Sequence, residues 1–154
     1  MIAKMRSLGA LTALLACVAP AHADWESTHW GTAPDAALAA LEGARSHAPT
    51  AADLYEYDGK QFSPLVKLPY ALDGIGGEAA LLFDADQSLQ FVTFTPDDLT
   101  QCDALAAALG ERHGAAEESG FGSTAILNWI DGDDVVRLTN STAIGICALS
   151  YGPA

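Results

Sequence analysis

The sequence predicts an α+β fold, with an antiparallel sheet of about six or seven strands and two helices packed on one face of that sheet. Three observations support this prediction. Apolar residues recur at helical spacing in two stretches, near residues 34–46 and 95–114, and alternating stretches with glycine turns follow each one. In addition, Cys102 and Cys147 fall in the second helical stretch and in the last alternating stretch, where a disulfide would join them.

The first residues have the pattern of a secretory signal peptide. Two basic residues precede an apolar run over residues 8–18, and Ala21-His22-Ala23 is a small-x-small cleavage signal. We therefore expect residues 1–23 to be removed on export and residues 24–154 to form a single domain that is periplasmic or secreted. The apolar run is too short to be a transmembrane segment. Cleavage before Cys17, in the lipobox-like Leu14-Leu15-Ala16-Cys17, is the alternative and would leave a lipid-anchored envelope protein.

The first half of the exported chain is predicted to be a helix followed by strands. Trp25 and Trp30 anchor an extended arm, and Pro34-Asp35 then opens a helix with proline at its first position and an acid in its first turn. This helix is expected to stop within residues 46–49. Asp58-Gly59 is a hairpin signal. Strands are expected over residues 54–57, 79–83 and 89–94, with a glycine-rich loop over 74–77. Phe62 and the run over residues 65–72 are expected to form an edge or a broken strand, because Pro64 and Pro69 lie in or beside it.

The second half repeats this order. Thr95 is predicted to cap a helix with Pro96 at its first position. The apolar spacing points Cys102 toward the core, and Gly110 and Gly114 are expected to end the helix. Residues 115–122 are a polar connection. A hairpin over 124–139 and a last strand over 143–151 follow, and Cys147 lies on one face of that strand with Leu149.

The two remaining cysteines are predicted to form a disulfide. Export places Cys102 and Cys147 in an oxidising compartment, and the bond closes a loop of about 45 residues, worth roughly 4 kcal/mol on the chain-entropy model. A reactive thiol is the alternative. It would need a low pKa, and the nearest basic side chain in sequence is about ten residues away from either cysteine.

The chain is strongly acidic. Its formal net charge is −13, and loss of residues 1–23 removes two of the seven basic residues and none of the twenty acids, which gives −15. Nucleic acids and anionic lipid surfaces are therefore not expected as partners, because both bind clustered Lys and Arg. The charge either keeps the domain soluble and monomeric or presents a face to a basic partner.

The sequence predicts no catalytic residue, no metal site and no cofactor. The histidines of the exported chain, His29, His47 and His113, are far apart and form no ligand pair. Asp84-x-Asp86-x-Ser88 begins like a calcium loop but lacks its later glycine and glutamate, so a hairpin turn is the better interpretation. The chain has no Gly-x-Ser-x-Gly motif for a nucleophile.

Tyr55 and Tyr57 are the candidate binding residues, because alternation puts both rings on the same side of their strand. We therefore expect a non-enzymatic exported protein that binds another protein or an envelope component through its sheet. The alternatives are a small hydrolase-like or metal-assisted enzyme and the lipid-anchored envelope protein. A pocket lined by several acids or histidines would favour the enzyme.

The opening motif carries a weak resemblance. Trp30-Gly31-x-x-Pro34-Asp35 resembles the W-G-x-[ST]-P-[DE] start of small exported bacterial α+β proteins of unassigned function, although Ala33 replaces the family's Ser or Thr. The first helix must then be capped by Thr32 or not at all. The order of elements is loosely similar to outer-membrane assembly lipoproteins and to the repeats of β-lactamase inhibitory proteins. Because residues 35–41 and 103–109 are similar, a duplicated helix-plus-meander unit is one interpretation. No functional residue is implied.

Overall fold

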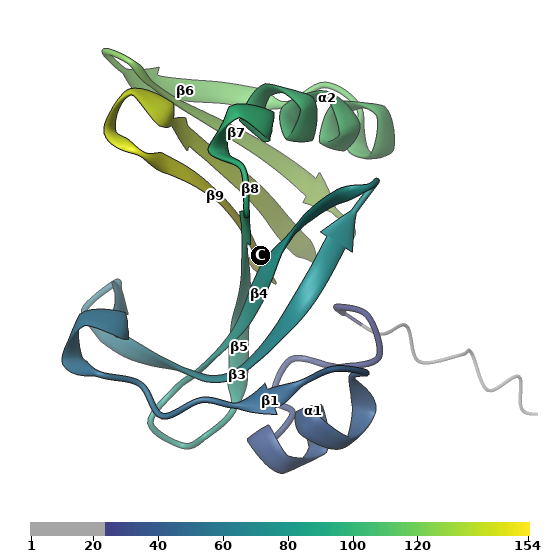
Figure 1. The fold of residues 1–154 in the computed structure, drawn as a ribbon, viewed down its shortest axis with the longest axis vertical. Helices are drawn as coiled ribbons and strands as arrows, with labels where there is room; N and C mark the ends of the chain where they lie inside the picture. Colours follow the sequence, from purple (N-terminus) through teal and green to yellow (C-terminus); the bar gives the residue numbers. More distant parts are fainter. Residues whose placement is uncertain (1–23) are drawn as a thin grey trace, which may run out of the picture.

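The computed structural model describes residues 24–154, so the predicted signal peptide and Cys17 lie outside the described residues. Within this range the chain forms one nine-stranded antiparallel sheet with two α-helices (Figure 1). The helices are α1 (Pro34–Ala40) and α2 (Cys102–His113). The strands are β1 (Arg45–Ser46), β2 (Tyr55–Tyr57), β3 (Lys60–Leu72), β4 (Ile75–Phe83), β5 (Leu89–Pro96), β6 (Glu117–Phe121), β7 (Thr124–Asp131), β8 (Asp134–Ser141) and β9 (Ile146–Pro153).

The α+β class is confirmed, but the expected strand count of six or seven is too low. The two strands that the sequence analysis missed are β1 and β6, and every residue of both is exposed. The period-two pattern arises when one face of a strand is buried and the other is exposed. A strand that is exposed on both faces therefore lacks this pattern in its sequence. Both lie at the edges of the sheet, where short and polar strands are common.

The order of helix and then antiparallel meander occurs twice along the chain. The strand order is β1-β3-β4-β5-β9-β8-β7-β6, with β2 paired to β3 outside this path. The last strand of the first half, β5, therefore pairs with the last strand of the second half, β9. Val92 lies opposite Tyr151, and Phe94 opposite Leu149, so the two halves meet side by side at the centre of the sheet.

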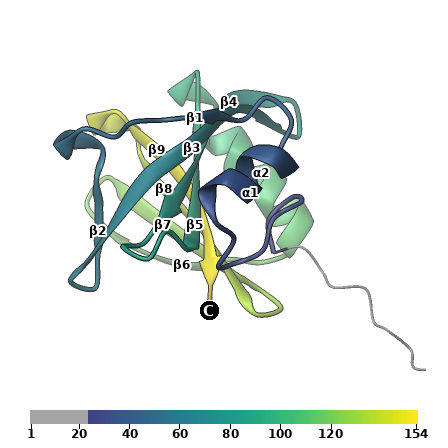
Figure 2. The ribbon, with the colours of Figure 1, turned by 90° about the horizontal axis from the view of Figure 1, so that it is seen from below.

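Both helices cover the same face of the sheet, as predicted, which we call the covered face. Val66, Leu81 and Val92 occupy paired positions on β3, β4 and β5 and pack in a buried cluster that includes Ala37 of α1. Phe94 and Leu149 continue this face into a second cluster with residues of α2. Figure 2 shows the helices on one side of the sheet and β2 on the other, which we call the open face.

A bulge in β3 changes which side chains reach each face. The burial of β3 alternates evenly, but the pairing with β4 shifts between Pro64 and Val66. Because one extra residue inverts the pleat, Phe62 and Pro64 point to the open face, whereas Val66 and Leu68 point to the covered face. A simple period-two reading of the sequence would put all four side chains on one face.

The start of the second helix differs from the prediction. Thr95 and Pro96 continue β5 and pair with Glu78 and Gly77 of β4, so neither one begins a helix. The cap is Asp98, whose side chain accepts hydrogen bonds from the Thr100 backbone N–H at 2.9 Å and from its hydroxyl at 2.6 Å. A short 3₁₀ turn (Leu99–Gln101) then leads into α2.

The glycine-rich loop predicted over residues 74–77 is also mostly strand. The turn is limited to Asp73 and Gly74, both of which have positive φ, and β4 begins at Ile75. Gly77 lies so close to β5 that a Cβ there would overlap the Thr95 carbonyl oxygen. Close backbone contact, not loop conformation, therefore explains this glycine.

The first helix is shorter than expected. It ends at Ala40, before the predicted stop at residues 46–49, and its N-cap Ala33 makes no side-chain capping bond. The arm before it is fixed by the two predicted tryptophans. Trp25 is buried and packs against Tyr70 with ring centroids 5.2 Å apart, and Trp30 Nε1 donates to Asp134 Oδ1 at 2.7 Å. The arm thus contacts β3 and β8, one strand from each half.

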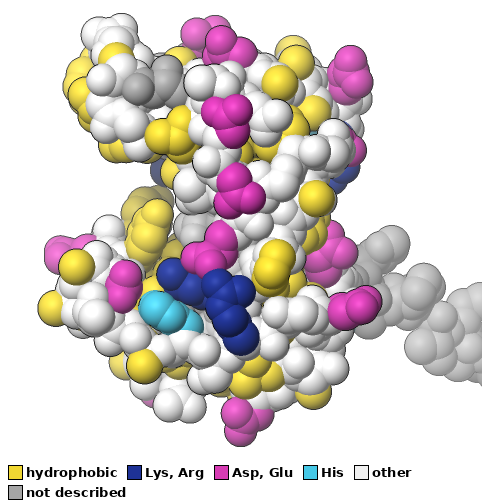
Figure 3. All heavy atoms as spheres, viewed as in Figure 1, with side chains coloured by type: hydrophobic (Ala, Val, Ile, Leu, Met, Phe, Trp, Pro, Cys, Tyr) yellow, Lys and Arg dark blue, Asp and Glu magenta, His cyan; other side chains and the backbone are white. Residues whose placement is uncertain are grey.

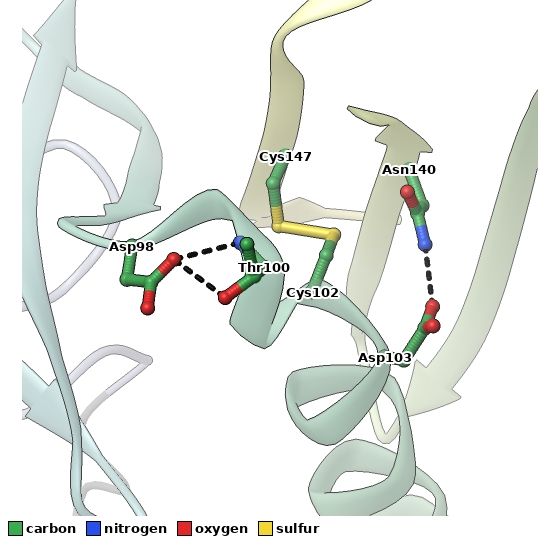
Figure 4. The surroundings of a disulfide bond; sticks show 6 residues. All are labelled: Asp98, Thr100, Cys102, Asp103, Asn140 and Cys147. Carbon is green, nitrogen blue, oxygen red and sulfur yellow. Dashed lines mark hydrogen bonds between the residues drawn. A yellow bond between two sulfur atoms is a disulfide. The ribbon is translucent and has the colours of Figure 1, made fainter. Parts of the chain in front are cut away.

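Cys102 and Cys147 form the predicted disulfide, with sulfur atoms 2.21 Å apart and Cα atoms 5.8 Å apart (Figure 4). Both cysteines are buried on the covered face. Asn140 Nδ2 donates to Asp103 Oδ1 at 2.9 Å beside the bond. At the other end of α2, Trp129 Nε1 donates to the Gly114 carbonyl oxygen at 2.9 Å. The helix is therefore tied to the sheet at both ends.

Candidate functional site

The open face carries a pocket of about 420 Å³ between β2 and strands β5, β8 and β9. Figure 3 shows the molecule hollowed on its left side, between the lower part with β2 and the upper part with β8 and β9. Tyr55 and Tyr57 lie at the rim, and their side chains are 47% and 57% exposed. The structure thus brings both candidate binding residues to one pocket, on the face of the sheet opposite the disulfide.

The aromatic part of the pocket is built around Phe91 of β5. Its ring packs edge to face against Phe62 at 5.0 Å and against Tyr57 at 5.8 Å, in the geometry that aromatic pairs favour. Gly152 of β9 leaves room for this ring, because a Cβ there would stand 2.5 Å from Phe91 Cδ1. The hairpin turn at Asp58 and Gly59, both with positive φ, returns the chain so that β2 faces Phe91.

A row of polar side chains crosses the open face next to these rings. Arg137, Ser150 and Thr93 lie opposite one another on β8, β9 and β5, and all three line the pocket. Arg137 Nε donates to Asn128 Oδ1 of β7 at 2.8 Å, which directs the guanidinium toward β7. One end of the pocket is therefore aromatic, and the other combines a cation with hydroxyl groups.

The charges around the pocket differ from those of the whole chain. Among the described residues, the basic side chains Arg45, Lys67 and Arg112 have carboxylate partners within 4.0 Å, whereas Arg137 and Lys60 have none. Of these last two, only Arg137 lines the pocket. The single acid in the lining is Glu56, which points to the opposite side of β2 from its two tyrosine neighbours.

The tyrosines with shifted titration lie on the covered face and not in the pocket. Burial, together with the hydrogen bond that its hydroxyl donates to Glu26 Oε1 at 2.6 Å, raises the pKa of Tyr70. Burial raises the pKa of Tyr151 to about 12. Both rings pack against the two core clusters. These phenols therefore stay protonated and contribute to the packing of the core.

The lining offers contact surface and one cation for binding. Among its side chains are one acid, Glu56, and one base, Arg137, and neither histidine nor cysteine is present in this described lining. In residues 24–154 no three histidine, cysteine, aspartate or glutamate side chains gather as a metal site would require. The Asp84 carboxylate instead accepts hydrogen bonds from the Asp86 and Ser88 backbone N–H groups within a hairpin turn.

A second hollow lies at the edge of the sheet formed by β6. The β6–β7 hairpin encloses a hollow of about 450 Å³, similar in volume to the pocket beside β2, and residues 118–125 alone line it. Nearby, Phe121 is 80% exposed, and Ile144 and Ile146 are 70% and 41% exposed. The sequence analysis did not single out these side chains, because no period distinguishes an exposed ring from a buried one.

Three important pocket residues were also missed from the sequence. Phe91 and Arg137 occupy the outward positions of strands whose inward positions are Val92 and Val136. In each strand, a large side chain stands at a position where the alternation predicts a solvent-facing residue. This pattern could have identified both residues as candidates for the open face. Gly152 gave no such signal, because its role depends on the distant Phe91 ring.

No helix within the described part of the chain has the length and apolar character needed to cross a bilayer. Comparison of the chain with protein-family models, with curated proteins and with solved structures found no match.

Proposed function

We propose that this is an exported, non-enzymatic protein that binds another protein of the cell envelope through the open face of its sheet. The observation that carries the proposal is the pocket of about 420 Å³ whose rim holds the half-exposed rings of Tyr55 and Tyr57. A buried disulfide is compatible with an oxidising compartment outside the cytoplasm.

The composition of the pocket supports a protein partner. Tyr and Arg are enriched among the residues that dominate binding energy at protein interfaces, and Tyr55, Tyr57 and Arg137 line this pocket together. The ring of Tyr57 already contacts Phe91 on one side, so a partner would bury it at little cost in side-chain freedom.

Site-specific photo-crosslinking in the exported protein tests this proposal. A photoreactive residue is placed at Tyr57 or Ala148, which line the pocket, and at Ala107, an exposed position of α2 on the opposite side of the sheet. We expect one discrete adduct from positions 57 and 148 and none from 107. Introducing Phe91→Ala should abolish the adduct from position 148, because it removes the ring on which Tyr57 packs.

Two outcomes would overturn the proposal. One is an adduct that forms from position 107 but not from the pocket positions. The other is the absence of any adduct from positions 57 and 148 in protein that is exported and folded, as judged by an intact disulfide between Cys102 and Cys147.

A further inference from the structure

We propose that the pocket binds the C-terminal residue of a partner polypeptide, with its apolar side chain on the aromatic cluster and its free carboxylate on Arg137. This inference rests on the proposed function and adds the chemistry of the occupant. Three observations carry it: the donors that Arg137 offers, the charges around it and the different chemistry of the two ends of the pocket.

Arg137 is held in place with its outer donors available. Its Nε is committed to Asn128 Oδ1 at 2.8 Å, so the fork formed by the two Nη groups remains for a ligand. Arginine binds carboxylates with two parallel hydrogen bonds, and an orientation fixed beforehand lowers the entropy lost on binding. The hydroxyls of Ser150 and Thr93 lie on the adjoining strands as additional donors.

Charge complementarity favours a carboxylate at this position. The exported chain carries twenty acids against five basic residues, yet the pocket lining contains one of each. The lone acid, Glu56, alternates away from the rings, whereas Arg137 extends from the sheet floor on the same face as Phe91. Arg137 is the one charged side chain that β5, β8 and β9 contribute to the described lining.

The two ends of the pocket match a group that is apolar at one end and anionic at the other. Arg137 is separated from Thr93 of β5 by two inter-strand spacings, roughly 10 Å, and its hydrogen bond to Asn128 turns its side chain toward β7. Phe91 is two residues from Thr93 along β5. A C-terminal Phe or Leu carries a side chain and a carboxylate on one Cα, whereas the side chains of Asp and Glu carry no large apolar group. Capture of a C-terminal carboxylate is a known mode of peptide recognition.

Isothermal titration with a matched pair of peptides tests the inference. The probes are Ala-Ala-Ala-Phe with a free carboxylate and the same peptide with a C-terminal amide, titrated into the exported chain and into Arg137→Gln. We expect the free acid to bind the wild type about tenfold more tightly than the amide, as for a charge-assisted hydrogen bond, and Arg137→Gln to remove this preference. Lys60→Gln is the control, because Lys60 is the other unpaired cation of the described chain and does not line the pocket. It should keep the preference.

Three results would overturn the inference while leaving the proposed function to its own test. The first is equal binding of the acid and the amide to the wild type. The second is a preference for the acid that survives in Arg137→Gln, when this variant has an unfolding curve like that of the wild type. The third is that neither peptide binds although position 57 still forms its adduct; the partner would then be held by something other than its C-terminus. Loss of the adduct itself would instead refute the proposed function.

Discussion

The two faces of the sheet use the same kinds of residue for different purposes. On β5, Phe94 points to the covered face and is 1% exposed, while Phe91 on the same strand points to the open face and lines the pocket. The covered face has two helices, a disulfide and two buried clusters. On the open face, β2 lies across part of the sheet. Apolar burial thus stabilises the fold on one side, and the rings left accessible on the other side are available for a partner.

Loss of the disulfide, which lies on the covered face, is expected to be among the largest effects. A Cys102→Ala/Cys147→Ala variant should lose about 4 kcal/mol of unfolding free energy, because the bond closes a loop with a sequence separation of 45 residues. Urea unfolding of the purified variant measures this loss. At a urea concentration where the variant is still folded, its peptide affinity should equal that of the wild type. A loss below about 1 kcal/mol would show that the bond adds little to the fold.

The two phenylalanines of β5 allow the faces to be compared directly. Phe94→Ala should cost about 3–5 kcal/mol, because it leaves a cavity in a buried cluster. Phe91→Ala should cost less than half of that, since its ring is only partly buried, but it should abolish partner binding. Urea unfolding and peptide titration of both variants make the comparison. Equal losses of stability would contradict the division between the faces.

Gly152 tests how closely the pocket is packed. Gly152→Ala should push the Phe91 ring away, costing about 1–3 kcal/mol as overpacking does, and it should weaken peptide binding. Gly110→Ala is the control, because Gly110 lies in α2 with nothing within 4 Å of the added methyl group, and this change should stabilise the protein by roughly 0.5–1 kcal/mol. Urea unfolding and peptide titration measure both variants. If Gly152→Ala retained full stability and binding, Phe91 would not be fixed by this contact.

The smallest expected effect is on the pH dependence of stability and comes from Tyr151, whose phenol is partly buried on the covered face. Tyr151 has its pKa raised to about 12 by burial, against about 10 in an unfolded chain. Its contribution to stability is therefore complete below about pH 10 and is lost as the pH rises through 12. Between pH 9 and 11, unfolding free energies of Tyr151→Phe should fall by about 1 kcal/mol less than those of the wild type. Identical pH slopes would show that Tyr151 does not make this contribution.

Local signals predicted the parts of the fold that depend on neighbouring residues. The Asp58-Gly59 turn requires positive φ at both positions, and the inward spacing of Cys102 follows from the helical period. Thr95 and Gly77 were assigned wrongly because their environment is the pairing of β4 with β5, which a local pattern does not contain.

The site was predictable only in part for the same reason. Alternation put Tyr55 and Tyr57 on one side of a strand, and the structure places both at the pocket rim. The alternation gave no indication that the β3 bulge turns Phe62 to the open face or that β9 brings Gly152 next to Phe91. A pocket assembled from six strands depends on their order in the sheet, and the strand order is not a local property of the sequence.

The most direct test of the division between the faces is an amide-resolved NMR titration with the free-acid peptide. We predict that the shifted amides will be confined to β2, β5, β8 and β9, with the largest changes near Tyr57, Phe91 and Arg137, while those of α1 and α2 stay in place. Shifts concentrated in the two helices, with the open face unchanged, would contradict the account.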